Sequence, residues 1–319
     1  MDTGLVYEII DCLPQERTLY YYFKDRYAFY LLGRLLRQRK CEAVRDIRSS
    51  SADQLLQKPA VKRFLSAKGN GIVSAQEMMD YWPSGDEEHV ETYRLSLGCW
   101  GQDYARDYRW QQTSRPGANL VLQLNFNSQH DANFESWTGV DETQFFNSWG
   151  HPISTRCKNT LAWARMDVDF QSDTVLIEEI QTDWLREVTW AANYVRRHKD
   201  KHAEVEYYGL KLRGRGLLSY QQLEAKRHQR IWAEAMLTAS LWFIHEELGI
   251  KRVYYHSATT GAVLKNIRHR KPPVSMYTDL PRRFCFEKDR EGPGFLHEDK
   301  RARRRLKCIK QPRWHKLVL

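Results

Sequence analysis

The feature that most constrains this chain is residues 175–184, which read Val-Leu-Ile-Glu-Glu-Ile-Gln-Thr-Asp-Trp. Apolar residues surround two adjacent carboxylates, Glu178 and Glu179, and a third, Asp183, follows closely. The branched apolar run predicts a buried β-strand, and the Asp-Trp step predicts the start of a helix. No other stretch puts so much charge beside so much apolar surface, so we expect the fold and any site to be organised around it.

The paired carboxylates are the first candidate catalytic groups. Successive strand residues point to opposite faces, so we expect only one of Glu178 and Glu179 to face a given cleft. An unpaired carboxylate on an apolar strand has a raised pKa, which a general base near neutral pH requires. The alternative is a Glu that pairs with Arg165 across a hairpin and belongs to the fold. Gln181 and Asp183 lie at the strand's end, where open α/β sheets bind ligands, although Asp183 can equally cap the helix.

Hydrophobic periodicity predicts the elements around this stretch. Residues 160–170 and 174–181 predict a hairpin, because only three residues link two strand-like runs. The second half of a helix at 220–248 is apolar nearly all round and is therefore expected to be buried. Residues 128–131 predict a polar turn and residues 198–220 a mobile loop. The remaining expectations are strands at 92–97, 119–127, 250–256 and 282–287 and helices at 184–197 and 257–266.

The chain divides into three predicted regions: a helical N-terminal module (1–85), an α/β core domain with the candidate site (86–298) and a basic C-terminal tail (299–319). In the module, residues 18–37 predict a long, mostly buried helix, and Ser74 begins a capping box. The predicted fold class is α+β, in which the helical module packs on a mixed, largely antiparallel sheet with a buried long helix.

Composition excludes several classes of protein. With 42% hydrophobic and 13% aromatic residues, the chain is not expected to be disordered. It lacks an apolar run of about 18 residues, so no membrane partner is expected, and its first residues lack the basic segment of a signal peptide. The six cysteines are scattered without a Cys-x-x-Cys pair. We therefore expect neither a zinc ribbon nor a disulfide framework, and a reducing, cytoplasmic setting.

The net charge of +10 is concentrated at one end of the chain. Residues 300–319 hold nine Lys or Arg and no Asp or Glu, which leaves 41 basic against 40 acidic residues elsewhere. A nucleic-acid partner would therefore be contacted by residues 300–316, and by the loop 104–115, where Arg109 and Trp110 are candidate substrate-binding residues. The alternatives are a solvated or docked tail and a loop whose rings fold onto the core.

Two further motifs are candidates. His130 is a candidate substrate-binding residue, but His130, Asp131 and His151 lack the tight spacing of a metal motif, so no metal is expected. Residues 211–216, Lys-Leu-Arg-Gly-Arg-Gly, have the composition of a phosphate-cradling loop that opens a helix. The same composition is common in flexible loops.

Residues 179–184 resemble the Glu-Ile-Gln-Ser-Asp-Trp signature of uncharacterised bacterial proteins and of segments of large phage-encoded polyvalent proteins. In those proteins, as in this chain, a Trp-bearing helix, a strand and a Tyr…Leu-Pro turn follow. The resemblance covers roughly residues 160–290, with matches at 232–248, 253–257 and 277–281.

A broader similarity is to the GNAT-type N-acetyltransferase fold, which has a strand with a splayed end, a phosphate-binding loop opening a helix, another strand, a short helix and a Tyr. That similarity implies acetyl-coenzyme A or a related thioester as cofactor. It also implies that Arg213, Gly214 and Gly216 hold the pyrophosphate and that Tyr277 protonates the leaving thiolate. The chain departs from the pattern at Lys211 and by an insertion at 198–210.

The leading hypothesis is therefore an acyltransferase-like enzyme that uses a coenzyme-A thioester on a nucleic-acid-linked, protein-linked or other acceptor. Glu178 or Glu179 would act as base, Tyr277 as acid, and Asp183 would belong to the same site. The competing hypothesis is a non-catalytic nucleic-acid-binding protein of a phage or defence-related system, in which the corner at Gln181 is structural.

Overall fold

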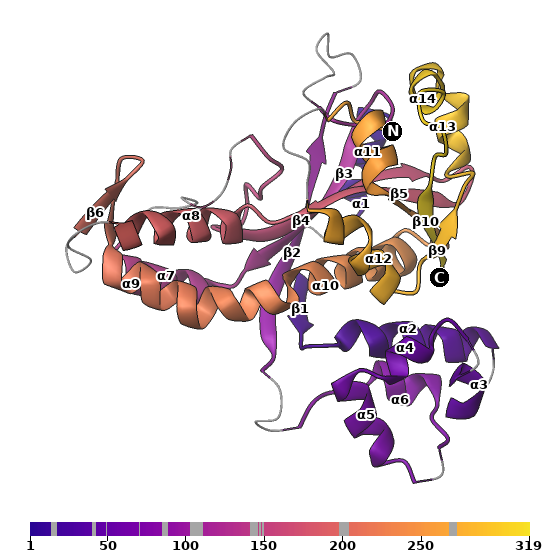
Figure 1. Cartoon of the computed structure of the whole chain (residues 1–319), viewed down its shortest axis with the longest axis horizontal. Helices are drawn as coiled ribbons and strands as arrows, with labels where there is room; N and C mark the ends of the chain where they lie inside the picture. Colours follow the sequence, from indigo (N-terminus) through magenta and orange to yellow (C-terminus); the bar gives the residue numbers. More distant parts are fainter. Residues whose placement is uncertain are drawn as a thin grey trace.

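An eight-stranded sheet runs through the centre of the computed structural model, in the order β1-β2-β3-β4-β5-β8-β10-β9 (Figure 1). Among the described strands of this sheet, β5 and β8 form the one parallel pair, and all other neighbours are antiparallel. The fold is therefore α+β with a mixed, largely antiparallel sheet, as the sequence predicts. The strands of this sheet are Thr18–Tyr22 (β1), Glu91–Trp100 (β2), Asn119–Phe126 (β3), Thr160–Asp169 (β4), Thr174–Gln181 (β5), Arg252–His256 (β8), Glu287–Asp289 (β9) and Trp314–Val318 (β10). The structure describes residues 1–319 except 14–17, 40–42, 49, 70, 85–88, 103–110, 141–145, 147, 149, 198–203 and 268–272.

The hairpin predicted at 160–170 and 174–181 is present as β4 and β5. Its turn places Asp173 at a left-handed φ of 50°, a conformation that Asp adopts more readily than most residues. All of β5 from Thr174 to Ile180 is buried, because helices and loops cover both faces of the sheet. The predicted helix α8 (Trp184–Arg197) follows directly.

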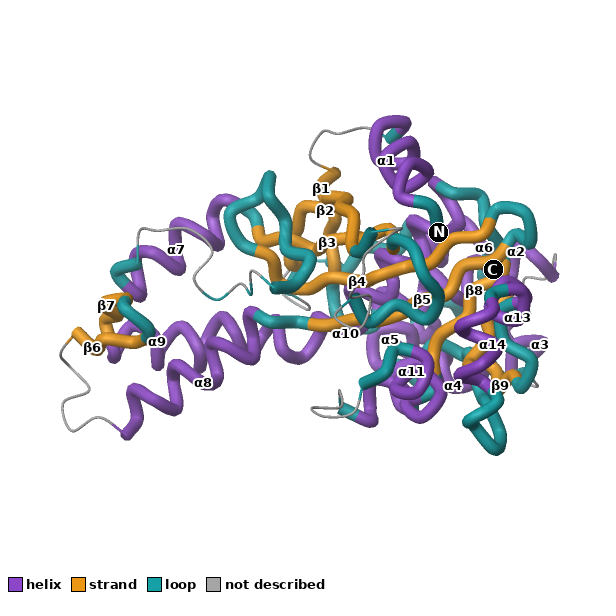
Figure 2. The backbone as a smooth tube through the Cα atoms, turned by 90° about the horizontal axis from the view of Figure 1, so that it is seen from above, coloured by secondary structure: helices purple, strands orange, loops and turns teal. Residues whose placement is uncertain are grey.

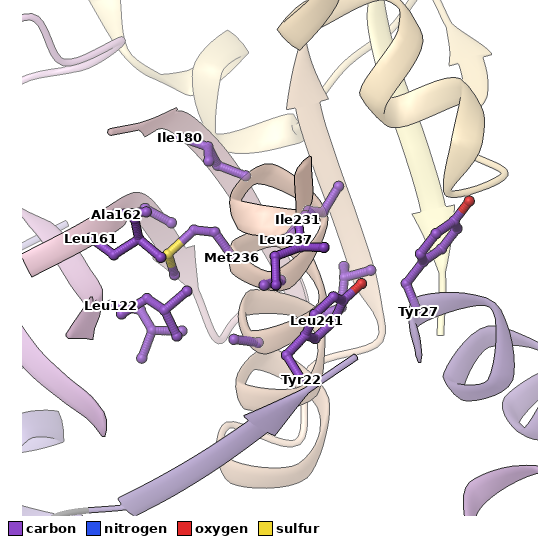
Figure 3. Close-up of a cluster of buried hydrophobic side chains, with 14 of the residues drawn as sticks. Tyr22, Tyr27, Leu122, Leu161, Ala162, Ile180, Ile231, Met236, Leu237 and Leu241 are labelled. Atoms are coloured by element: carbon purple, nitrogen blue, oxygen red, sulfur yellow. The ribbon is translucent and has the colours of Figure 1, made fainter. Parts of the chain in front are cut away.

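The long buried helix is also present. It is a continuous helical rod made of α9 (Gly214–Tyr220), a π-helical turn (Gln221–Ala225), α10 (Lys226–Trp242) and a second π-helical turn (Phe243–Glu247). Figure 3 shows Met236 of α10 lying toward Leu161 of the sheet, and Leu241 beside Tyr22. The helix is apolar on several faces because it packs between the sheet and the N-terminal elements.

The predicted helix over 18–37 is wrong in its first part. Residues Thr18–Tyr22 form β1, which pairs antiparallel with β2, and the helix begins only at Arg26. Alternate side chains of β1, Tyr20 and Tyr22, are buried. Aromatic residues suit a half-buried strand as well as a buried helix. Residues 18–22 therefore belong to the central sheet and not to an all-helical module.

Except for α1 (Thr3–Cys12), which precedes β1, the helices of the module lie between β1 and β2, and Ser74 forms the predicted capping box with Glu77. The helices outside the central rod and the arm are α1 (Thr3–Cys12), α2 (Arg26–Arg39), α3 (Val44–Arg48), α4 (Asp53–Leu56), α5 (Pro59–Ser66), α6 (Ala75–Met79), α11 (Ala258–Leu264), a 3-10 turn (Val274–Tyr277), α12 (Asp279–Arg283), α13 (Gly294–Glu298) and α14 (Lys300–Leu306).

The C-terminal residues are part of the sheet and not a separate tail. Strand β10 lies between β8 and β9, and its Trp314 is fully buried. The alternative in which the end of the chain docks back is therefore the one observed. The strand predicted at 282–287 is wrong, because α12 ends at Arg283 and β9 begins only at Glu287. Phe284 and Phe286, which suggest a strand by their spacing, are buried in the connection between these two elements.

An arm extends from one end of the sheet and consists of α7 (Ser128–Thr138), α8, the hairpin β6–β7 (Glu204–Tyr207 and Leu210–Arg213) and α9 (Figures 1 and 2). The polar turn predicted at 128–131 is instead the first turn of α7, which Asn127 caps. The mobile loop predicted at 198–220 contains the β6–β7 hairpin and α9 in its described part. In the described residues, no helix combines the length and apolar character needed to cross a membrane.

Candidate functional site

The candidate site lies where β5 and β8 separate. Their parallel pairing runs from Thr174 opposite Arg252 to Ile177 opposite Tyr255 and stops there. Immediately beyond this point, β5 carries Glu178 and Glu179, and β8 ends at His256. Polar side chains therefore occupy the gap between two otherwise apolar buried strands.

A β-bulge changes the direction of the two carboxylates. On β4, Arg165 lies opposite Glu179 and Met166 opposite Ile177, so Glu178 is an extra residue without a cross-strand partner. A bulge interrupts the regular alternation of side chains. The prediction that Glu178 and Glu179 belong to different faces assumes strict alternation, and the bulge removes that assumption.

Lys265, which directly follows α11 and is 1% exposed, contacts the backbone of one glutamate and the side chain of the other. Its Nζ donates to the Glu178 carbonyl oxygen at 2.8 Å and lies 3.5 Å from Glu179 Oε2. Burial lowers the pKa of Lys265, and the charges of Glu179 and Glu178 oppose that shift. Glu178 and Glu179 are therefore members of one buried polar cluster.

Glu178 is fully buried and ionised. It accepts hydrogen bonds from Ser114 N at 2.8 Å, from Ser114 Oγ at 2.8 Å and from His256 Nε2 at 3.0 Å. Burial alone would raise the pKa of Glu178, but the hydrogen bond and charge of His256, Lys265 and the Ser114 amide lower it to about 2. A carboxylate held in this way is a poor base at neutral pH.

Ser114, His256 and Glu178 do not form a nucleophilic triad. Ser114 Oγ lies 2.8 Å from the same Nε2 atom that contacts Glu178. In a triad, the serine and the carboxylate contact different ring nitrogens, so that one holds the ring while the other loses a proton. The three residues, each fully buried, instead fix the bulge and the end of β8.

Glu179 pairs with Arg165 across the hairpin, which is the structural alternative left open by the sequence. The Arg165 guanidinium lies 5.4 Å from the ring centre of Trp100 and 5.8 Å from that of Trp163, and it donates to Gln111 O at 2.8 Å. Burial raises the pKa of Glu179, but Lys265 and Arg165 outweigh it and lower the pKa. The raised pKa expected for an unpaired strand carboxylate is therefore absent from Glu178 and Glu179, because both are paired.

Tyr277 lies beside this ion-paired group. Its ring centre is 5.9 Å from Lys265 Nζ and 5.7 Å from the ring of Tyr255. Burial, followed by the charge of Glu179, raises the pKa of Tyr277 well above its ordinary value. The raised pKa keeps this hydroxyl protonated at neutral pH and makes it a weaker acid than an exposed tyrosine. Tyr277 and Glu179 are therefore both neighbours of Lys265.

Asp183 lies at the corner between the end of β5 and the start of α8. The carboxylate is almost fully buried. It accepts hydrogen bonds from His151 Nδ1 at 2.8 Å, from Trp163 Nε1 at 3.0 Å and from Gln181 Nε2 at 2.6 Å. It also forms an ion pair with Arg186. It does not act as the expected side-chain cap of α8. The hydroxyl of Thr182 instead accepts from Leu185 N at 3.4 Å.

The corner pairs a buried carboxylate with an accessible imidazole. Burial raises the pKa of Asp183, but the hydrogen bond and charge of His151 and the bond from Trp163 lower it overall. The His151 side chain is 34% exposed. A carboxylate that orients one nitrogen of a half-exposed histidine is the arrangement of a general base.

Several predicted site residues lie elsewhere. His130 stacks on Phe126 at 3.5 Å and contacts Tyr220 Oη at 2.9 Å inside the arm, where burial lowers its pKa. Its ring packs in the aromatic core of the arm and not at the β5–β8 gap. Arg109 and Trp110 lie outside the described residues.

The predicted phosphate cradle is also displaced. Gly214 and Gly216 open α9 at the outer end of the arm, far from the β5–β8 gap in both views (Figures 1 and 2). A Cβ on Gly216 would lie 1.7 Å from Trp137 O, and Arg213 donates to Ser136 O at 3.1 Å. Gly216 and Arg213 therefore serve the close contact between α7 and α9, and this placement does not fit a cofactor cradle at the site.

Sequence reasoning does not find four participants: Ser114, His151, His256 and Lys265. The sequence suggests His151 only as a metal ligand, and it is 32 positions from Asp183. No periodic pattern links such distant residues. The described residues contain no group of three or more His, Cys, Asp or Glu side chains that could hold a metal ion.

The described cluster therefore contains a buried phenol beside an ion-paired carboxylate, and, at the end of β5, a histidine oriented by a second carboxylate. Comparison of the chain with protein-family models, curated proteins and solved structures found no match.

Proposed function

We propose that the chain is an acyltransferase-like enzyme that uses a coenzyme-A thioester and acts at the divergence of β5 and β8. The observation that carries this proposal is the end of the parallel pairing at Ile177 and Tyr255, directly beside Glu179 and Tyr277. The splayed strand β5, the helical rod, β8, α11 and Tyr277 occur in the order of the acetyltransferase resemblance, although α8 and the β6–β7 hairpin lie between β5 and the rod and the phosphate-binding loop is not at the site.

The proton donor in this proposal is Tyr277. When the acyl carbon–sulfur bond breaks, the thiolate takes the phenolic proton, and the acyl carbon bonds to the nitrogen or oxygen of the acceptor. The acceptor's proton passes to His151, which Asp183 orients. His151 replaces Glu178 and Glu179 as the base, because the lowered pKa values of both carboxylates weaken them for that role.

Glu179 then acts on the site through charge. Its ion pairs with Arg165 and Lys265 fix the carboxylate beside Tyr277, and its charge helps to raise the pKa of the Tyr277 hydroxyl. The charge of Arg165 acts on the pKa of Tyr277 in the opposite direction and so favours release of the phenolic proton.

The experiment for this proposal is thermal unfolding of the full chain with acetyl-coenzyme A, coenzyme A and, as a control, ATP. A ligand present at 100 times its Kd stabilises the folded state by about 2.7 kcal/mol, and we expect both coenzyme-A species to raise Tm. The Tyr277→Phe variant should keep this shift, because the phenol acts on the reaction and not on cofactor binding. A folded protein whose Tm is unchanged by every coenzyme-A species would refute the proposal.

The second candidate is a non-catalytic protein that binds nucleic acid through its basic C-terminal residues. Exposed cations on and after α14 favour it: Lys300, Arg303, Arg304, Lys307 and Lys310. Deleting residues 300–319 is not a clean test, because it would remove β10 from between β8 and β9. The Arg303→Glu/Arg304→Glu variant keeps the strand and should abolish a salt-dependent binding to duplex DNA or RNA if this surface makes it. Binding that this variant retains would count against the second candidate.

A further inference from the structure

Helix α8 presents a row of exposed rings to solvent. Trp190 is 52% exposed and Tyr194 is 39% exposed. Residues four apart lie on one face of a helix, so the two rings are neighbours. Arg186 is four residues before Trp190, and its guanidinium lies 5.3 Å from the ring centre of Trp190. The opposite face of α8, with Ala191 and Val195, packs into the arm.

The row continues onto the β6–β7 hairpin. Tyr194 lies 5.3 Å from the ring of Tyr207, which lies 4.6 Å from the ring of Tyr208. Tyr208 is 86% exposed and takes a left-handed φ of 49° at the tip of the hairpin. Bulky residues seldom adopt that conformation, so the turn holds this ring in water at some cost. Tyr207 itself is only 6% exposed and links Tyr194 to Tyr208, so the rings of this row that reach solvent are Trp190, Tyr194 and Tyr208.

The inner end of the row reaches the candidate site. The guanidinium of Arg186 contacts both the Trp190 ring and the carboxylate of Asp183, which orients His151. An extended ligand that lay along α8 would therefore end at the one imidazole of this corner. In Figures 1 and 2, α8 runs from the sheet to the outer hairpin, as such a track requires.

The charges along the row are positive. Among its described residues, α8 carries Arg186, Arg196 and Arg197 against a single acid, Glu187. The hairpin adds no net charge of its own, because each of its acidic residues is paired across the strands with a basic one. These pairs are Glu204 with Arg213 and Glu206 with Lys211.

Exposed rings flanked by arginines fit one class of ligand better than others. Bases of a single strand stack on aromatic side chains, and arginines contact the phosphates between them. A duplex hides the faces of its bases, and a membrane-binding helix would need a broad apolar face with aliphatic side chains, whereas the exposed face of α8 also carries Thr189 and Asn193.

We propose that the row formed by Trp190, Tyr194 and Tyr208, which the buried Tyr207 supports, binds single-stranded nucleic acid by stacking. The bound strand runs along α8 toward His151. The binding itself is independent of the acyl-transfer chemistry, but the statement that the strand carries the acceptor group rests on the proposed function.

The experiment is fluorescence anisotropy of the full chain with labelled single-stranded and duplex oligonucleotides of the same sequence, as RNA and as DNA. We expect the single strands to bind more tightly than the duplexes. Loss of a stacking ring costs about 1–3 kcal/mol, so Trp190→Ala and Tyr194→Ala should each weaken binding by at least about fivefold. The matched control is Trp82→Ala, which removes a ring that is 49% exposed and outside the arm, and it should leave the affinity unchanged.

The inference would be overturned if the protein bound no single strand, or if the two α8 variants bound single strands as tightly as the native protein does. It would also be overturned if duplex bound with equal affinity and the Arg303→Glu/Arg304→Glu variant lost that binding. Binding of the row to anionic vesicles or to a proline-rich peptide in place of nucleic acid would also overturn it. If the protein fails these tests but coenzyme A raises its Tm, the proposed function is retained and the strand-binding surface is rejected. If the protein binds single strands through α8 but no coenzyme-A species changes its Tm, the strand-binding surface is retained and the proposed function is rejected.

Discussion

At the scale of single residues, the site depends on how buried charges are paired. Lys265 is shared between the Glu178 carbonyl and the Glu179 carboxylate, and Arg165 takes the other side of Glu179. Removing one partner from a buried pair is strongly destabilising, because the remaining charge stays desolvated. The same pairing lowers the pKa of both carboxylates, which is the reason the proposed function gives the proton-accepting role to His151 and not to them.

Glu178 makes the folded state sensitive to acid. Its pKa is about 2 in the folded protein and about 4.3 in an unfolded chain. A lowered pKa stabilises the folded state above the unfolded value, and this stabilisation is lost as the pH falls toward the folded value. The pKa of His256 is also lowered in the folded protein. Its burial therefore also destabilises the folded state as the pH falls, beginning near the unfolded histidine pKa of about 6.5.

We therefore expect the stability difference between the native protein and the Glu178→Gln variant to be largest at pH 7 and to shrink by up to about 3 kcal/mol by pH 2–3. Urea unfolding at several pH values, followed by tryptophan fluorescence, measures this difference. Glu298→Gln, at an exposed position, is the matched control. A Glu178→Gln difference that is the same at every pH would show that this carboxylate is not held ionised.

At the scale of elements, the close contact between α7 and α9 explains why Gly216 is a glycine in residues 211–216, a run that the sequence suggests as a phosphate-binding loop. The expected cradle and the observed α7–α9 contact both require glycine, because each needs a backbone to approach closely. The sequence alone does not show whether the approaching group is a phosphate or the carbonyl of Trp137.

The Gly216→Ala substitution distinguishes the two. Its Cβ would meet the Trp137 carbonyl, and overpacking of this kind costs about 1–3 kcal/mol. We expect lower stability in urea and an unchanged response to coenzyme A. Gly69→Ala is the control, since no atom lies within 4 Å of a Cβ there. Normal stability together with loss of the coenzyme-A response would restore the phosphate cradle.

Elements with one clear periodicity are predictable from the sequence. The β4–β5 hairpin and α8 lie where the sequence places them, since apolar residues repeat with the period of a single structure. Residues 18–22 are misassigned because three consecutive tyrosines satisfy both periods, and pairing with β2 decides between them. Strand β10 is not predicted, because the basic residues before it are typical of a solvated tail. Trp314 and the apolar residues 317–319 indicate only that the C-terminal end packs onto the rest of the protein.

At the scale of the whole molecule, the fold assembles the site from segments that are far apart in the chain. Glu179, Asp183, Gln181 and Tyr277 can be chosen from the sequence, because they follow the central strand or match a family pattern. Ser114 and His256 reach Glu178 across 64 and 78 positions, from a loop and from the end of another strand. Contacts of this kind depend on sheet order, which no local pattern specifies.

The sheet and the arm have different roles in the proposed function. The sheet holds the ion-paired group that surrounds Tyr277, and the arm extends an aromatic row from the corner at Asp183. Both meet at His151, a residue with one nitrogen fixed by a buried carboxylate and with a third of its side chain exposed.

The rate at which the protein releases free thiol from acetyl-coenzyme A at neutral pH tests the proposed function, with amine-bearing single-stranded oligonucleotides and small amines as acceptors. Removing a general acid or base lowers such a rate by about 10²–10⁴-fold. We expect release by the native protein and a loss of that size in both Tyr277→Phe and His151→Ala, while each variant keeps its Tm shift with coenzyme A. Equal rates for the native protein and both variants would contradict the roles proposed for Tyr277 and His151.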